Sequence, residues 1–321
     1  MISTTASTQL FGVLGSPVSH SLSPAIHSVA IEKEGIDAVY LAFEVGPQAL
    51  SAALDGLRAI GARGLSITAP HKERILPLLD GVSDLARRVG AVNTVFRGSR
   101  GELLGDNTDV GGLEAAISEA IVDISGRSTV VLGAGGAASA AVVALARGGA
   151  RQVTVLARDE ERGSRLVERL RCSKACPRAI LKVGLLEEKP PCLEEAAVVV
   201  QATSAPILEG PGVDLSSCSR GTLALDMAYD GITSGPALAA YTGEEEESSE
   251  RRRPPCDTAF IREARKADLE TIDGVRVLIH QGVLAWRLWL GRPLGPESER
   301  AVFEISKSYR EIMSRPTDSE A

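Results

Sequence analysis

The chain has 321 residues, the length of about two ordinary domains. Hydrophobic residues make up 44% and charged residues 24%, so folded cores are expected and a disordered chain is not. A net charge of −7 and an aromatic content of 3% lack the basic surface and stacking side chains of nucleic-acid binding proteins. No apolar run approaches the ~20 residues of a membrane-spanning helix, and the first residues lack the pattern of a secretory signal.

Five cysteines are an odd number in a chain too large to need disulfides for stability, which favours reduced thiols in a cytoplasmic protein. Cys172 and Cys176 are close in sequence, but the four histidines, at positions 20, 27, 71 and 280, are far from them. A closed zinc site needs four nitrogen or sulfur ligands, so we predict no metal site.

The first hundred residues alternate short apolar runs with amphipathic stretches. This pattern predicts strands at 10–15, 38–45 and 65–68, helices at 23–34 and 47–60, and a further helix that begins near Pro70. Alternation of strand and helix is typical of a mostly parallel sheet. Two more runs, 91–96 and 102–105, are separated by Gly98 and Gly101 and indicate a hairpin attached to that sheet.

A second alternating block follows a helix expected at about 110–120. Its strands are rich in β-branched residues and leucine, as in strands covered on both faces, and are predicted at 129–132, 153–157, 197–201 and 223–226. The pattern fails after Gly235, where residues 243–255 form an acidic and then basic low-complexity run that we interpret as a solvated loop. Helical patterns return at 259–267, 275–290 and 297–313.

The clearest motif has the form G-x-G-x-x-A, directly after a predicted strand and at the start of an alanine-rich helix. In this motif Gly133 allows the tight turn, Gly135 lets the backbone approach a pyrophosphate, and Ala138 permits close helix packing. Ala134, Gly136 and Ala137 complete the loop. The N-terminus of the following helix offers free N–H groups and a positive dipole end to phosphate, so we predict a dinucleotide site here.

The next strand ends in Ala157-Arg158-Asp159, the position that contacts the adenosine ribose in such folds. Arg158, together with Arg162 one helical turn later, favours the 2′-phosphate of NADP. Asp159 favours the 2′-hydroxyl of NAD, unless its carboxylate points outward at the N-terminus of the following helix, where the helix dipole stabilises it.

Polar side chains also follow the strands of the first block. Ser21 and Ser23 come after the first strand, and Thr68 ends the third, close to Lys72. A lysine at the start of the expected helix would oppose the helix dipole, and such a conflict often marks function. Asn93-Thr94 and the run Gly105-Asp106-Asn107-Thr108-Asp109 lie on either side of the hairpin.

Together these segments resemble the shikimate dehydrogenase family, and the resemblance covers nearly the whole chain. The matching segments, in family order, are Ser21-Leu22-Ser23-Pro24, Thr68-Ala69-Pro70-His71-Lys72, Gly90-Ala91-Val92-Asn93-Thr94, Gly105-Asp106-Asn107-Thr108-Asp109, the Gly133 loop, Ala202-Thr203-Ser204, Asp226-Met227-Ala228-Tyr229, and Asp273-Gly274 with Gln281-Gly282. Enzymes of this family reduce 3-dehydroshikimate to shikimate with NADPH, a step of aromatic amino-acid biosynthesis.

The resemblance implies a role for each matching position. Lys72 and Asp109 correspond to the catalytic pair; Ser21, Ser23 and Tyr229 to the residues that hold the substrate carboxylate; and Thr68, Asn93 and Gln281 to contacts of the ring hydroxyls. On the cofactor side it implies the loop 133–138, Ala157, Arg158, Arg162, Thr203 and Met227.

The resemblance also implies the architecture. We expect an α/β substrate domain at 1–108 and 274–321, and a Rossmann-type NADP domain at 109–273 with the charged insert near 235–257. The C-terminal helices would return to the first domain, and the substrate would bind in the cleft between the two. A monomer or a homodimer is compatible with this interpretation.

Departures from the family pattern fall on the cofactor side. They are Ala157-Arg158-Asp159, Gln201 before the Ala-Thr-Ser segment, the charged insert, and Arg276-Val277, where a family glycine and a residue lining the nicotinamide end have changed. The leading hypothesis is an NADP-dependent shikimate dehydrogenase. Alternatives are a quinate/shikimate dehydrogenase that prefers NAD, a more distant methylenetetrahydrofolate dehydrogenase-like activity, and a non-catalytic shikimate-binding regulator.

Overall fold

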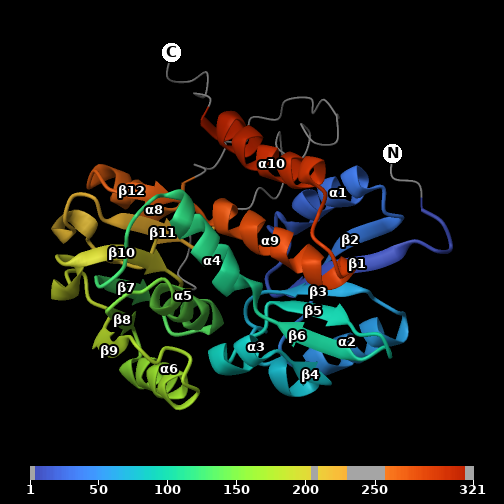
Figure 1. The fold of residues 1–321 in the computed structure, drawn as a ribbon, viewed down its shortest axis with the longest axis horizontal. Coiled ribbons are helices and arrows are strands. Elements are labelled where there is room, and N and C mark those ends of the chain that lie inside the picture. The colour runs from blue at the N-terminus through green and yellow to red at the C-terminus, as the bar shows by residue number, and fades with distance from the viewer. Residues whose placement is uncertain (1–3, 204–208, 230–256, 315–321) are drawn as a thin grey trace.

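The computed structural model describes residues 4–203, 209–229 and 257–314. Two six-stranded sheets lie side by side, each covered by helices, and two central helices run between them (Figure 1). The charged run at 243–255, like Ser204 of the Ala-Thr-Ser segment, lies outside the described residues. Within the described part of the chain, no helix is long and apolar enough to cross a membrane.

The first sheet contains β1 (Gln9–Gly15), β2 (Ala38–Glu44), β3 (Gly64–Ile67), β4 (Gly81–Val82), β5 (Thr94–Arg97) and β6 (Leu103–Asp106). Its strand order is β2-β1-β3-β5-β6-β4. The first three strands are parallel, and β5 and β6 form an antiparallel hairpin beside β3, as the sequence pattern indicates. The carboxyl ends of β1, β3 and β6 and the start of β5 therefore meet at one edge of the sheet.

The helices of this half are α1 (Ser23–Glu34), α2 (Leu50–Ala59) and α3 (Asp84–Val89). Helix α1 ends where predicted, because Gly35 takes the left-handed conformation at φ 64° that suits glycine.

The prediction of a helix from near Pro70 is wrong. Residues after β3 form turns and a single short 3₁₀ segment, Leu76–Leu78. Pro77 explains the difference, because it lacks an N–H group and would interrupt any helix that began near Pro70 within its first turns. Lys72 therefore lies in a turn, and its charge does not oppose a helix dipole.

The second sheet contains β7 (Ser128–Leu132), β8 (Gln152–Ala157), β9 (Ile180–Leu185), β10 (Ala196–Gln201), β11 (Leu223–Asp226) and β12 (Glu270–Ile272). All neighbouring strands pair in parallel, in the order β12-β11-β10-β7-β8-β9. This is the doubly wound order of dinucleotide-binding folds, with its switch point between β7 and β10. Helices α5 (Gly136–Arg147), α6 (Glu160–Cys172) and α8 (Ala259–Lys266) cover it.

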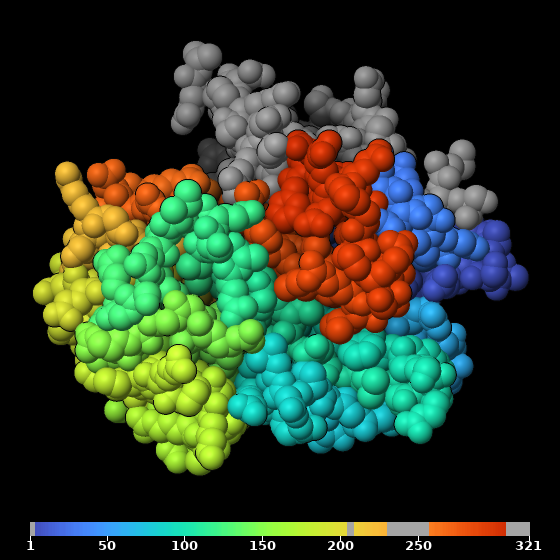
Figure 2. Space-filling view, viewed as in Figure 1, coloured from blue at the N-terminus to red at the C-terminus, as the bar shows by residue number. Residues whose placement is uncertain are grey.

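Helices α4 (Thr108–Glu119) and α9 (Gly274–Leu290) pack against each other between the two sheets. Helix α9 then brings Trp286 and Trp289 against Phe11 of β1, with ring centroids 5.3 and 5.4 Å away. Helix α10 (Pro296–Ser314) packs on α1. The C-terminal helices thus return to the first half, and Figure 2 shows the last of them, in orange-red, above the blue and teal residues of that half.

Candidate active site

A pocket lies where the carboxyl edge of the first sheet meets the end of β11 and helix α9. Its lining includes every residue predicted to contact substrate, namely Ser21, Ser23, Thr68, Lys72, Asn93, Asp109, Tyr229 and Gln281. Ala137 and Met227, predicted on the cofactor side, also line it. The structure therefore brings together groups separated by more than 200 positions in the sequence, at the meeting point of the two halves.

A lysine and an aspartate form the charged centre of the pocket. Lys72 Nζ lies 2.7 Å from Asp109 Oδ2, and the two side chains are only 18% and 6% exposed. Asp109 stands in the first turn of α4, where the helix dipole favours a carboxylate, and Asn107 caps that helix by accepting from Val110 N. The carboxylate is thus held at a fixed place, and the ammonium reaches it from the turn after β3.

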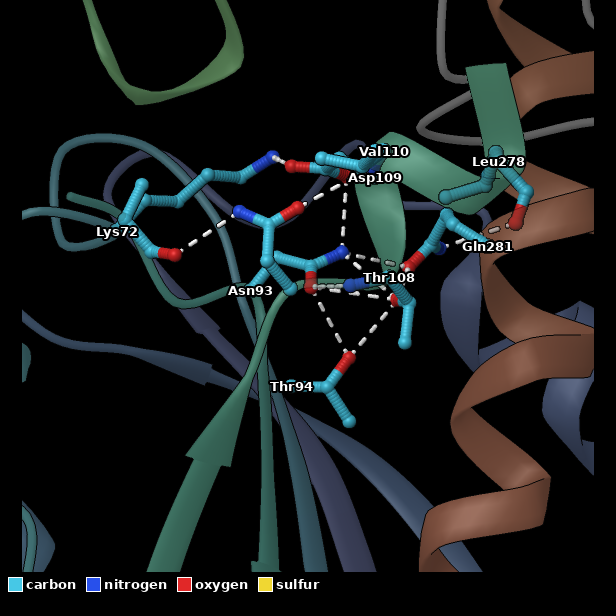
Figure 3. A network of polar contacts seen from close by, with 10 residues as sticks. Lys72, Asn93, Thr94, Thr108, Asp109, Val110, Leu278 and Gln281 are labelled. Atoms are coloured by element: carbon cyan, nitrogen blue, oxygen red, sulfur yellow. Dashed lines mark hydrogen bonds and ion pairs between the residues drawn. The ribbon is translucent and has the colours of Figure 1, made fainter. Parts of the chain in front are cut away.

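A network of buried amide and hydroxyl groups supports the second oxygen of Asp109 (Figure 3). Asn93 Nδ2 donates to Asp109 Oδ1 at 2.8 Å and lies 3.1 Å from Gln281 Oε1. Asn93 Oδ1 accepts from the backbone N–H of Thr108 at 2.7 Å. Because each partner is fixed by another, Asn93 links the hairpin, α4 and α9 in one arrangement.

Three hydroxyl groups gather at another wall of the pocket. Ser21 Oγ lies 3.5 Å from the hydroxyl of Tyr229 and accepts from Ser23 N at 3.2 Å. Ser23 is the first residue of α1, so the positive end of that helix dipole lies beside these hydroxyls. Burial raises the pKa of Tyr229, which keeps its hydroxyl protonated as a donor. Such a group of donors suits a carboxylate.

The turn that carries Thr68 and Lys72 is fixed by buried contacts. Thr68 N donates to Leu14 O at 2.9 Å, and Val92 N donates to Lys72 O at 2.8 Å. His71 is fully buried, and its Nε2 lies 2.6 Å from Val45 O. The lysine is therefore anchored by its backbone on both sides, while its side chain extends into the pocket.

Sequence reasoning missed two polar residues of the pocket, His20 and Ser66. Both stand within or beside segments already singled out, one directly before Ser21 and the other two residues before Thr68. In a strand, residues two apart point to the same face, and this spacing could have found Ser66. Val277 does line the pocket, whereas Arg276 turns away to pair with Glu119 at 2.6 Å.

The glycine loop at the end of β7 has the geometry of a phosphate cradle. Gly133 has φ 115°, and a Cβ there would lie 2.7 Å from Ala202 O, so only glycine fits. Gly135 caps α5 in an extended conformation and leaves the first N–H groups of that helix free of a side-chain cap. Ala138 is fully buried, which allows close packing of α5. A Cβ on Gly136 would lie 3.0 Å from Lys72 Cβ, so the loop abuts the pocket.

The residues after β8 lie beside this loop. A Cβ on Gly135 would lie 3.7 Å from a guanidinium nitrogen of Arg162, which places that exposed cation over the cradle. Asp159 caps α6, because its carboxylate accepts from Arg162 N at 3.1 Å. Arg158 is exposed, and Ala157 before it is buried at the end of β8.

The ends of the neighbouring parallel strands β10 and β11 lie side by side at the edge of the second sheet that carries the glycine loop. Gln201, one of the departures from the family pattern, accepts from Thr203 N at 2.7 Å and so fixes the start of that loop. Asp226 is fully buried and accepts from Ala228 N at 2.8 Å and from Thr258 Oγ1 at 2.5 Å. These contacts hold Met227 and Tyr229 against the pocket.

In the described part of the chain, no group of three or more histidine, cysteine or acidic side chains is arranged so that it could bind a metal ion. A doubly wound sheet with a glycine cradle, beside a polar pocket with a lysine–aspartate pair, instead defines a two-domain α/β protein of the dinucleotide-dependent oxidoreductase class.

Comparison with known proteins gives the family. Residues 13–95 match the family model "Shikimate dehydrogenase substrate binding domain", and residues 116–228 match "Shikimate / quinate 5-dehydrogenase". The chain belongs to the shikimate dehydrogenase family.

Individual relatives agree with this. The shikimate dehydrogenase (NADP(+)) of Symbiobacterium thermophilum is 37% identical over 88% of this chain and 90% of its own length. The crystal structure of shikimate dehydrogenase from Aquifex aeolicus superposes with a TM-score of 0.76 at 31% identity, over 94% of this chain and 99% of that one. The Thermus thermophilus enzyme, solved with NADP(H) and shikimate, gives a TM-score of 0.72 at 32% identity, over 93% and 100%.

Proposed function

We propose that the protein is a shikimate dehydrogenase that reversibly reduces 3-dehydroshikimate to shikimate with NADPH, within aromatic amino-acid biosynthesis. The observation that carries this is the Lys72–Asp109 pair, held at 2.7 Å inside a pocket of hydroxyl and amide groups next to the glycine loop. A small polyhydroxylated carboxylate needs such a set of converging donors and acceptors.

The residues present fit NADP. The cradle at Gly133 and Gly135 admits a backbone approach that a Cβ would block, and the free N–H groups at the start of α5 suit a pyrophosphate. Arg162 and Arg158 would hold the 2′-phosphate with charge-assisted hydrogen bonds. The Asp159 carboxylate already accepts a hydrogen bond as the N-cap of α6, so it is a poorer acceptor for a ribose hydroxyl. Ala137 and Met227 both line the pocket, so they would flank the nicotinamide end of the cofactor there.

The chain's own groups handle the proton at the reacting oxygen. The nicotinamide of the bound cofactor supplies hydride transfer to and from the ring carbon. Lys72 would donate a hydrogen bond to the ketone oxygen, stabilise the developing alkoxide and protonate it. Asp109 would orient that ammonium and take part in returning the proton, and Asn93 fixes the carboxylate for this task.

The other polar groups would orient the substrate. Ser21, Ser23 and Tyr229 would receive the carboxylate, and Thr68, Asn93 and Gln281 the ring hydroxyls. Binding energy from these remote contacts is realised in both the ground state and the transition state, so they act mainly on affinity. Because the pocket draws residues from both halves of the molecule, substrate and cofactor would meet between them.

The experiment is NADP-linked oxidation of shikimate by the purified protein, followed by the absorbance of NADPH, with NAD in a parallel series. We expect turnover with both shikimate and NADP present and a higher kcat/KM with NADP than with NAD. A higher kcat/KM with NAD would favour the quinate/shikimate dehydrogenase alternative. Shikimate binding by calorimetry without any turnover would favour a non-catalytic regulator.

The proposal includes the setting of the enzyme. We propose a cytoplasmic enzyme that works as a monomer or homodimer, supported by the reduced thiols that the odd cysteine count favours.

A further inference from the structure

Tyr40 lies beneath the pocket and has no role in the function proposed so far. It stands on β2 and is 4% exposed. Its hydroxyl donates to Ser66 Oγ at 2.8 Å, and Ser66 on β3 lines the pocket. Since the phenol uses its one proton in this bond, Ser66 keeps its own proton for a partner in the pocket.

Burial keeps the phenol protonated. It raises the pKa of Tyr40 and outweighs the hydrogen bond with Ser66, which lowers that pKa, so the group stays a neutral hydroxyl. The phenol proton thus remains available to Ser66, and one buried hydrogen bond joins β2 to the pocket residue on β3.

The ring of Tyr40 is held rigidly. It stacks on His27 with centroids 4.4 Å apart and planes 24° from parallel, and Trp289 lies 6.1 Å away. Burial lowers the pKa of His27 to about 3, so the stacked imidazole is neutral. Aromatic packing therefore fixes where the phenol oxygen lies, and that oxygen in turn fixes the orientation of the Ser66 hydroxyl.

We propose that Tyr40 is a positioning residue for the hydroxylated carboxylate substrate, because its hydroxyl holds the Ser66 side chain in the orientation that faces the pocket. This inference rests on the proposed function and deepens it, since it says which buried group determines substrate affinity. Tyr40 is not among the residues that line the pocket, so it would act only through Ser66.

The test is Tyr40→Phe, which removes one oxygen and keeps the aromatic packing. We expect the Kd of shikimate by calorimetry and its KM to rise about three- to tenfold, the range of one neutral hydrogen bond. The value of kcat should stay within about twofold and the KM of NADP should not change, as for a loss of uniform binding. In a Ser66→Ala background the effect of Tyr40→Phe should shrink, because the two residues act in series.

Thr222→Val is the matched control. Thr222 is a buried hydroxyl that donates to Ala196 O at 2.7 Å in the other half of the molecule, so its loss should lower Tm without changing shikimate affinity. An unchanged Kd in Tyr40→Phe overturns the proposal, as does an equal rise in Thr222→Val or full additivity with Ser66→Ala. A wild-type protein that binds no shikimate overturns the proposed function itself, and the positioning role with it.

Discussion

Lys72 reaches Asp109 from a turn that the backbone anchors on both sides, so its ammonium can be removed without disturbing a helix. Lys72→Ala should therefore lower kcat by about 10²- to 10⁴-fold, the usual contribution of a general acid–base group, with little change in shikimate Kd. Asp109→Asn should lower kcat less, because it loosens the ammonium without removing it. Steady-state kinetics across neutral and alkaline pH measure this, and near-normal kcat in Lys72→Ala would refute the assignment.

Cofactor choice depends on the exposed residues after β8. Arg158→Ala should raise the KM of NADP and leave that of NAD nearly unchanged, because only NADP carries the 2′-phosphate. Asp159→Thr should widen the preference for NADP: threonine can still cap α6, but it removes the negative charge beside the phosphate. Paired kcat/KM values for both cofactors measure each change. An Arg158→Ala variant that loses affinity for both equally would place this arginine elsewhere.

Asp226 gives a pH dependence with a defined sign. Burial, more than the repulsion from Asp273, raises its pKa from 3.8 to about 7 in the folded protein. The folded state then binds a proton that the unfolded state has released, so the stability that this group contributes is fully present below about pH 4. That stability is lost as the pH rises to about 7, by at most about 1.4 kcal/mol per pH unit.

The asparagine in Asp226→Asn cannot ionise, so this variant does not lose that stability as the pH rises. The unfolding free energy of the variant minus that of the wild type should therefore increase between about pH 5 and about pH 8. Urea unfolding at several pH values across that range measures the difference. Asp214→Asn is the control, because hydrogen bonds with Ser216 and Lys189 hold the pKa of Asp214 at about 2, outside this range. A difference between Asp226→Asn and wild type that is constant across the whole range would contradict the prediction.

Residues that the sequence singled out at the ends of strands lie together in one pocket, and their roles stay predictions. Ser21, Lys72 and Asn93 were singled out because polar groups follow strands, and the pocket does contain them. Ser66 and Tyr40 were missed because a polar residue on a buried strand looks like any other strand residue until its partner is known. Their contact joins β2 and β3, and no pattern in one strand encodes it.

At the scale of elements, the packing of α4 against α9 determines how Asp109 and Gln281 are placed around Asn93, which contacts both. Gly112 of α4 is buried, and a Cβ there would lie 2.9 Å from Gln281 Cβ and 3.0 Å from Gln281 N. Gly112→Ala should therefore push the helices apart, destabilise the fold by about 1–3 kcal/mol as overpacking does, and lower kcat/KM for shikimate.

The control for Gly112→Ala is Gly56→Ala on α2, where nothing lies within 4 Å of the added Cβ. That change should leave activity intact and stabilise the fold by up to about 1 kcal/mol, because alanine is the better helix former. Thermal unfolding and steady-state kinetics on both variants measure the contrast. If Gly112→Ala is also neutral or stabilising, the close approach of the two helices is not a constraint on the site.

Elements with clear periodicity were predictable and short ones were not. Strands β7, β8, β10 and β11 have uninterrupted apolar runs, and helix α1 was predictable from its ends, Pro24 at the start and Gly35 after the last turn. Strand β9 was missed because Lys182 and Gly184 interrupt its pattern, and β12 because it has only three residues. Such edge strands form because a neighbouring strand is already in place, which is information from tertiary structure.

At the scale of the whole molecule, helix α3 of the first half docks on α5 and α6 of the second. Ser139 Oγ donates to Val89 O at 2.5 Å, Arg169 lies 3.4 Å from the same carbonyl, and Ser173 Oγ donates to Arg88 O at 3.0 Å. These donors satisfy the C-terminal carbonyls of α3, where positive charge is favoured. Helices α4 and α9 join the two halves elsewhere (Figure 1). Two separate contacts therefore brace the two halves on either side of the pocket.

This second contact holds the turn of Lys72 against the glycine loop, since Gly136 has Lys72 and Ala91 as its nearest neighbours. Arg169→Met keeps the aliphatic stem and removes the guanidinium, so it should destabilise the protein by about 1–3 kcal/mol. It should also lower kcat, because the distance from Lys72 to the bound cofactor becomes less defined, while shikimate Kd stays unchanged.

The control is Arg165→Met on the same helix, which removes only an exposed ion pair with Glu161 and should change neither stability nor kcat. Thermal unfolding, kcat and calorimetry on the two variants measure this. Equal kcat in Arg169→Met and wild type would show that α4 and α9 alone set the geometry of the cleft.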